Sequence, residues 1–150
     1  RRFMKAIERA RVKPDRIVVE ISEATSSADP ERVSQVLAEL ARWKVGLAID
    51  DFGTGSSNLL RLQREKPRFL KIDNAFVSQL EDKTSFLIVL AACQLAKSLG
   101  MQSLAEGVEK ESQLLTLRKM GCLFAQGRHL SPPVPAAQLR ELSRKTWKLN

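Results

Sequence analysis

Each of five short apolar runs in this sequence ends on, or contains, a polar side chain able to take part in chemistry. These side chains are Glu20, Asp50 and Asp51, Lys71, Glu106 and Gln126. A single residue of this kind is often a helix cap, but capping does not explain five positions in succession. If the runs are parallel strands, their carboxyl ends meet along the edge where α/β proteins bind ligands. We therefore expect these side chains to converge.

Four of the converging side chains are carboxylates, namely Glu20, Asp50, Asp51 and Glu106. Held together without compensation they would repel strongly, and divalent cations are the natural compensation. A set of oxygen ligands favours Mg²⁺ or Mn²⁺ over Zn²⁺. The adjacent pair Asp50 and Asp51 suits a two-metal arrangement, which can activate water and stabilise the leaving oxygen in phosphodiester cleavage. The pattern predicts a metal-dependent phosphodiesterase site.

Several nearby polar residues have two readings each. Lys71 either contacts a phosphate and orients the attacking water, or neutralises the carboxylates through a salt bridge. Glu23 either bonds amides of the loop at 53–55 or is a solvent-exposed acid. Asp73 and Glu109 are either supports behind the site or local caps. The Gly-Thr-Gly turn at 53–55 could cradle a phosphate, although such a turn is more often a tight connection.

The elements that position these residues follow a βα repeat. Apolar runs at 17–19, 45–49, 69–72, 103–105 and 123–125 predict strands. Helical spacing, together with capping and helix-breaking residues, predicts the helices. One begins at Pro30 after an Asp29 cap, one runs from a Thr84 cap to Gly100, one spans 111–120, and one runs from Pro135 towards Trp147. The end of a further helix is expected around Phe3, Met4 and Ile7. We expect one domain over residues 1–150, with a parallel sheet covered on both faces.

Composition narrows the function classes. The 150 residues are 43% hydrophobic and 28% charged, and no apolar run approaches the ~20 residues that span a bilayer. The net charge of +8 is compatible with an anionic partner, but we favour the simpler interpretation that the basic residues form a solvated surface. With 5% aromatics, a stacking platform for single-stranded nucleic acid is not expected. Cys93 and Cys122 read as buried thiols in a reducing cytoplasm, and the single His129 leaves little material for a histidine-based site.

Four ordered motifs resemble the EAL domain of bacterial cyclic-di-GMP phosphodiesterases. They are Asp50-Asp51-Phe52-Gly53-Thr54-Gly55, Leu70-Lys71-Ile72-Asp73, Ala105-Glu106-Gly107-Val108-Glu109 and Ala125-Gln126-Gly127. The segment Val19-Glu20-Ile21-Ser22-Glu23 is similar to the glutamate-rich strand end of that family. The resemblance covers essentially the whole chain. It implies a TIM-like (β/α)₈ barrel, of which this chain carries five consecutive βα units.

The resemblance also implies an activity, the hydrolysis of cyclic di-GMP to linear pGpG with Mg²⁺ or Mn²⁺. By position, Glu20 and Asp50 resemble metal ligands, and Asp51 resembles a ligand of the second metal. Lys71 and Glu106 resemble catalytic groups near the attacking water.

Two further positions carry over from the same resemblance. Gln126 resembles a contact to substrate or water. Glu23 resembles the anchor of the loop after Asp51, which the family links to catalysis and to dimer formation.

The sequence also departs from the family pattern. The Glu-Ala-Leu signature and a metal-binding Asn are absent and are expected upstream of Arg1, so the two-metal site is incomplete in this chain. Ser56 stands where the family has Tyr. The residues after Gly127, which begin at Arg128, replace Tyr-Leu-Phe-Ser-Arg. Arg128 either adds a phosphate contact or faces solvent.

These departures shape the remaining expectations. A closed barrel takes about 250 residues. We therefore expect this chain, which lacks an initiator Met, to be a piece of a longer enzyme and to be inactive or very weak alone. The alternative is a cyclic-di-GMP sensor or protein-interaction domain that has lost catalysis. A basic domain that binds duplex nucleic acid ranks last, because no recognition motif supports it. An open half-barrel would expose its first strand, so we also expect a homodimer that covers this edge.

Overall fold

A single parallel sheet of five strands organises the chain. The computed structural model describes residues 2–22, 30–54, 62 and 65–144. Its strands are β1 (Val18–Ser22), β2 (Gly46–Phe52), β3 (Phe69–Ile72), β4 (Gln102–Ala105) and β5 (Phe124–Ala125). They lie side by side in chain order, and every neighbouring pair is parallel. The predicted five βα units are confirmed.

The helices follow the predicted order with some changes at their ends. The described helices are α1 (Arg2–Arg9), the 3₁₀ turn η1 (Pro14–Arg16), α3 (Pro30–Arg42), α5 (Asn74–Val77), α6 (Lys83–Ser98), α7 (Glu111–Lys119) and α8 (Ala136–Leu142). The expected cap of α6 at Thr84 is wrong. The carboxylate of Asp82 accepts from the N–H of Ser85 at 2.8 Å, so the N-cap lies two residues earlier than expected. The Asp29 cap and the extension towards Trp147 lie outside the described residues.

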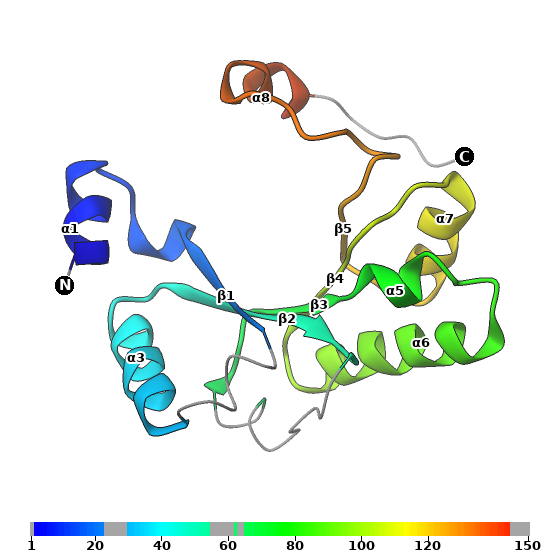
Figure 1. Ribbon diagram of the computed structural model, residues 1–150, viewed down its shortest axis with the longest axis horizontal. Helices are drawn as coiled ribbons and strands as arrows, with labels where there is room; N and C mark the ends of the chain where they lie inside the picture. The colour runs from blue at the N-terminus through cyan, green and yellow to red at the C-terminus, as the bar shows by residue number, and fades with distance from the viewer. Residues whose placement is uncertain (1, 23–29, 55–61, 63–64, 145–150) are drawn as a thin grey trace.

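The helices that connect the strands lie on one side of the sheet, and Figure 1 shows α3, α6 and α7 on its outer side. Strands that follow one another in chain order, joined by right-handed crossovers, place their helices on the same face. The expectation of a sheet covered on both faces was therefore wrong for the part of the chain that the structure describes. This is the arrangement of a barrel wall.

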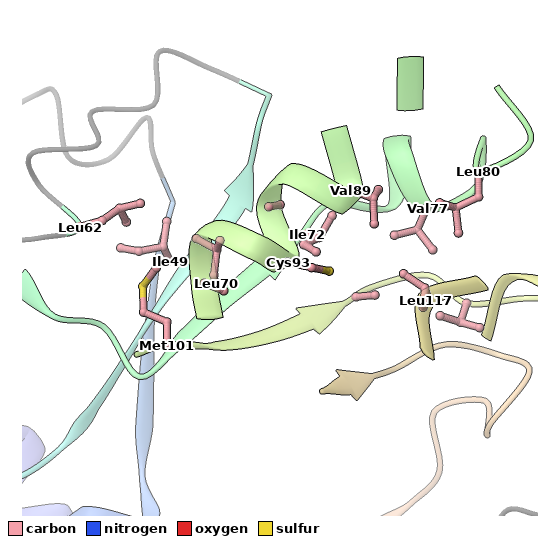
Figure 2. Packing of buried hydrophobic residues seen from close by; sticks show 14 residues of the cluster. Ile49, Leu62, Leu70, Ile72, Val77, Leu80, Val89, Cys93, Met101 and Leu117 are labelled. Atoms are coloured by element: carbon pink, nitrogen blue, oxygen red, sulfur yellow. The ribbon is translucent and has the colours of Figure 1, made fainter. Parts of the chain in front are cut away.

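The main hydrophobic cluster lies between the sheet and helices α5, α6 and α7 (Figure 2). Leu70 and Ile72 of β3 are fully buried and pack in one cluster with Val89 of α6 and Leu117 of α7. Emptying such a position usually costs about 2–5 kcal/mol, so this cluster sets the stability of the sheet. Because side chains alternate along a strand, the intervening Lys71 points to the opposite face. The core thus determines which face carries the polar residues.

Within the described residues, every helix is too short or too polar to cross a lipid bilayer.

Candidate active site

Lys71 is the centre of a charged cluster on the inner face of the sheet. Its Nζ lies 2.8 Å from a carboxylate oxygen of each of Glu20, Asp50 and Glu106. These acids come from β1, from β2 and from the end of β4, and Lys71 comes from β3 between them. The side chain of Lys71 is 8% exposed. The predicted convergence at the carboxyl edge is therefore present. Lys71 neutralises the carboxylates through salt bridges, which is the second of the two roles predicted for it.

The electrostatics of Lys71 reflect these contacts. Burial alone would lower the pKa of the ammonium group, but hydrogen bonds to Asp50, Glu106 and Glu20 outweigh burial and raise that pKa above its ordinary value. Lys71 therefore carries a full positive charge throughout the neutral range.

Asp51 reaches the same side of the sheet as Asp50 because the strand bulges there. The register between β2 and β3 shifts between Ile49 and Phe52, and Asp51 has φ +56°. In a regular strand, consecutive side chains point to opposite faces, and an extra residue with positive φ breaks that alternation. The turn is closed by Thr54, whose N–H and Oγ1 both donate to the carbonyl of Asp51, at 3.2 and 2.9 Å. The bulge thus makes a paired carboxylate site possible.

Three carboxylates lie close enough to share a cation. Oxygen atoms of Asp50, Asp51 and Glu106 are all within 4.8 Å of one another. Burial, followed by the charges of Asp50 and Asp73, raises the pKa of Asp51. Burial also raises the pKa of Glu106, against the lowering effect of Lys71. Three crowded carboxylates that offer only hard oxygen donors fit a divalent cation such as Mg²⁺, Mn²⁺ or Ca²⁺.

Glu20 stands apart from this group of three. Its side chain is half exposed, its Oε2 accepts from Lys71 at 2.8 Å, and it is not part of the carboxylate group described above. The sequence-based assignment put Glu20 with the metal ligands and Glu106 with the catalytic groups. In the described structure Glu106 is the third member of the carboxylate group, and Glu20, on the outer strand β1, contacts the cluster through Lys71.

The other predicted positions fall in different places. Gln126 donates from Nε2 to Oε1 of Glu106, so it contacts the cluster. Asp73 caps α5 by accepting from the N–H of Ala75 at 2.7 Å, and it also lies beside Asp51. The predicted cap is present, and the supporting role of Asp73 stays a prediction. Arg128 and Glu109 are exposed, whereas Glu23, Gly55 and Ser56 lie outside the described residues.

Gln113 is a positioning residue that the motifs did not reveal. It is 7% exposed, and its Oε1 accepts from the backbone N–H groups of Glu109 and Lys110 at 2.8 and 2.9 Å. Its Nε2 donates to the carbonyl of Val77 at 3.2 Å. The loop that follows Glu106 is therefore tied to α5 through one buried amide. The available signal was a Gln at the third position of a helix, as in a capping box.

Gly107 lets this loop approach α5 closely. Its φ is +71°, and a Cβ placed on it would lie 2.0 Å from Oδ1 of Asn74. Both the backbone conformation and the contact exclude a side chain here. The glycine of the Ala-Glu-Gly-Val-Glu motif is thus part of the geometry that holds Glu106.

A family model described as "EAL domain" matches residues 1–133 of this sequence. The chain belongs to the EAL domain family. Among curated relatives, it is 39% identical over 135 residues to MucR of Pseudomonas aeruginosa, described as a bifunctional diguanylate cyclase/cyclic di-GMP phosphodiesterase. It is 32% identical over 137 residues to PdeA of Escherichia coli, a probable cyclic di-GMP phosphodiesterase. These alignments include 89% and 91% of this chain but only 20% and 19% of the relatives, so it spans about a fifth of their length.

Solved EAL structures match the fold as well. The MucR phosphodiesterase in complex with c-di-GMP superposes with a TM-score of 0.86 at 39% identity, over 91% of this chain and 56% of that one. BlrP1 of Klebsiella pneumoniae, solved as manganese/cy-diGMP and calcium/cy-diGMP complexes, gives TM-scores of 0.78 and 0.77 at 31% identity, over 83% of this chain and 32% of those. The described sheet is therefore part of an EAL-type, TIM-barrel-like fold. The motifs that resemble the family place their polar residues at its carboxyl edge.

Proposed function

We propose that this chain supplies part of the active site of a cyclic-di-GMP phosphodiesterase, which hydrolyses cyclic di-GMP to linear pGpG. The observation that carries the proposal is the group Asp50, Asp51 and Glu106, held beside Lys71 at the carboxyl edge of an EAL-family sheet. Relatives of known structure were solved with cyclic di-GMP, one of them with manganese. We infer Mg²⁺ or Mn²⁺ as the physiological cations, because hard oxygen donors suit both.

The residues divide into two roles. Asp50 and Asp51 would hold the cations, and Glu20 or Glu106 would supply further oxygen ligands. When bound, the cations supply charge stabilisation of the phosphate and activation of a water molecule. Once cations compensate the carboxylates, Lys71 is no longer needed to neutralise them. Its ammonium group is then free to contact the phosphodiester.

Glu106 and Gln126 act together at the attacking water. The raised pKa of Glu106 brings its carboxylate closer to the range in which it can accept a proton at neutral pH. Gln126 orients that carboxylate by donating to Oε1. We keep Arg128 as a phosphate contact, Glu23 as the anchor of the loop after Asp51, and Asp73 and Glu109 as supporting groups.

Calorimetry with cyclic di-GMP, with and without Mn²⁺, tests the proposal. We expect binding that requires the cation, is abolished by Asp51→Asn, and is unchanged by Asp15→Asn at an exposed position far from the cluster. Binding that is indifferent to metal would favour the sensor that has lost catalysis. Absence of binding by a chain with a folded circular dichroism spectrum would refute both readings. For hydrolysis, we expect this chain alone to be inactive or very weak, because its sequence lacks the Glu-Ala-Leu signature and the metal-binding Asn that the resemblance implies.

We also propose a homodimer that covers β1. Among the described strands only β2 pairs with β1, and the edge strand of an open sheet favours pairing with another chain. Light scattering at increasing concentration should reveal the dimer, and a clean monomer at high concentration would contradict it. We place the chain in a reducing cytoplasm, since Cys93 and Cys122 are free thiols.

A further inference from the structure

The short helix α5 (Asn74–Val77) touches both of the backbone segments that carry Asp51 and Glu106. It starts directly after β3, where Asp73 caps it by accepting from the N–H of Ala75 at 2.7 Å. It has only four residues, yet the turn after Asp51 packs against one of its side chains and the loop after Glu106 packs against another. The helix therefore stands between two of the three carboxylates that could share a cation.

The turn after Asp51 packs against Phe76 of α5. A Cβ placed on Gly53 would lie 2.9 Å from Cε2 of Phe76, so the backbone of the turn lies directly against the ring. The ring is partly buried and packs against the main hydrophobic cluster, which holds it in place. Phe76 therefore sets how closely the turn that carries Asp51 can approach α5.

The loop after Glu106 packs against a different side of the same helix. A Cβ placed on Gly107 would collide with the side chain of Asn74, so the loop backbone lies against that side chain. Asn74 and Phe76 are two positions apart, and side chains at that spacing do not share a face of a helix. The two segments that carry carboxylates are therefore held apart by the body of α5.

Gln113 of α7 ties the loop to α5. Its Nε2 donates to the carbonyl of Val77 at 3.2 Å, and its Oε1 accepts from the N–H groups of Glu109 and Lys110 at 2.8 and 2.9 Å. The Gln113 side chain is buried, and the Val77 side chain is fully buried in the core (Figure 2). Breaking this contact would leave buried polar groups without partners, so the loop is held at a fixed distance from the helix.

We propose that α5 is a spacer that sets the separation of Asp51 and Glu106, and that Gln113 is the positioning residue that fastens this spacer. Oxygen atoms of these two carboxylates and of Asp50 lie within 4.8 Å of one another. The inference rests on the proposed function, because the spacing matters only to a bound cation. Mg²⁺ demands near-ideal octahedral geometry, whereas Ca²⁺ accepts irregular sets of oxygen ligands. A loosened spacer should therefore weaken Mg²⁺ binding more than Ca²⁺ binding.

Gln113→Glu separates the two halves of the contact. A carboxylate at this position still accepts from the N–H groups of Glu109 and Lys110, but at about pH 8 it has no proton to donate to Val77. The loop then keeps its cap and loses its tie to α5. Leu114→Ala is the matched control. Leu114 is the next residue of α7 and packs against the core, but it lines a cavity whose described lining includes no residue of α5.

The amide signal of Gly53 in NMR spectra of the chain reports on the spacer without any metal. An aromatic ring shifts the resonances of nuclei beside it, so a movement of Phe76 changes the Gly53 signal. We expect this signal to move in Gln113→Glu and to stay in place in Leu114→Ala. An unmoved Gly53 signal in Gln113→Glu would overturn the proposal, because the two sides of α5 would then be independent.

The reciprocal variant reads the spacer from the other side. Phe76→Leu removes the ring that meets Gly53 and leaves the bonds of Gln113 in place. In the metal-free chain, we expect the amide signals of Glu109 and Lys110 to move. Signals that stay unchanged would contradict a spacer that acts as one body.

Titration of the same samples with Mg²⁺ and with Ca²⁺ tests the consequence for cations. We expect Gln113→Glu to weaken Mg²⁺ binding about tenfold, as is usual when a group that orients metal ligands is lost, and to weaken Ca²⁺ binding less. Leu114→Ala should change neither. Equal losses for the two cations would overturn the role of the spacer in cation binding. If the unaltered chain binds neither cation, the proposed function fails, and the Gly53 signal still decides whether α5 is a spacer.

Discussion

Replacing Lys71 with methionine removes the cation that three carboxylates share while keeping the length of the side chain. Removing one partner of a fully buried ion pair destabilises a protein by about 3–5 kcal/mol, because the remaining charge is left uncompensated. Here Glu20 is 50% exposed, Asp50 24% and Glu106 16%, so water screens part of the repulsion. We expect Lys71→Met to lower the free energy of unfolding by about 2–4 kcal/mol at neutral pH.

The pH dependence of this loss follows from the direction of the pKa shifts. Glu106 and Asp51 have folded-state pKa values raised above the unfolded ones, so each favours folding at low pH and loses that contribution as pH rises through its folded pKa. Lys71 limits the loss by lowering both pKa values. The raised pKa of Lys71 itself matters only above about pH 10, where its contribution is lost. The penalty of Lys71→Met should therefore shrink or change sign near pH 4 and grow towards pH 7.

Urea unfolding at both pH values, with and without Mn²⁺, measures the effect. Because a divalent cation can replace the lost positive charge, Mn²⁺ should restore more stability in the variant than in the unaltered chain. Lys97→Met on the exposed side of α6 is the matched control and should change little. A penalty that is the same at both pH values and insensitive to Mn²⁺ would mean that Lys71 acts through packing, and the electrostatic reasoning would be refuted.

Three further changes test the geometry around the cluster. Asp51→Asn should keep the fold, since Asn tolerates positive φ, but should abolish the upward shift of the melting temperature on adding Mn²⁺; an unchanged shift would exclude Asp51 as a ligand. Gly107→Ala should destabilise the chain by about 2–3 kcal/mol in urea unfolding, because its Cβ meets Asn74, and Gly100→Ala, with positive φ but open space, should cost less. Gln113→Ala should cost about 1–3 kcal/mol by leaving buried N–H groups without a partner, and unchanged stability would contradict its role as the tie between the loop and α5.

The sheet and the face that carries the site followed largely from the sequence. Apolar runs separated by helical patterns predicted five parallel strands, and all five are present. The local sequence of a strand decides which of its residues are buried. In β3, for example, Leu70 and Ile72 are buried on one face, and Lys71 between them points to the other face. Polar residues at successive strand ends converge by topology alone. The one-sided placement of the helices was missed, because it depends on strand order and not on any single segment.

Helix boundaries were less predictable. Asp82 and Thr84 are both acceptable caps, and only the approach of the Ser85 N–H to the Asp82 carboxylate decides between them. Likewise, Phe86 and Leu87 follow the helical apolar pattern but are 37% and 52% exposed, because α6 turns another face to the sheet. The choice between competing local signals is made by packing.

The sequence by itself determined which residue types reach the carboxyl edge and that their chemistry suits an acidic metal site. Only the tertiary structure decided how they combine. Strand alternation predicts opposite faces for Asp50 and Asp51, and a bulge in the register with β3 brings them together. Lys71 makes three ion pairs because strands distant in the chain lie side by side in the sheet. Distances between such segments depend on the register and packing of every strand between them, which no local pattern specifies.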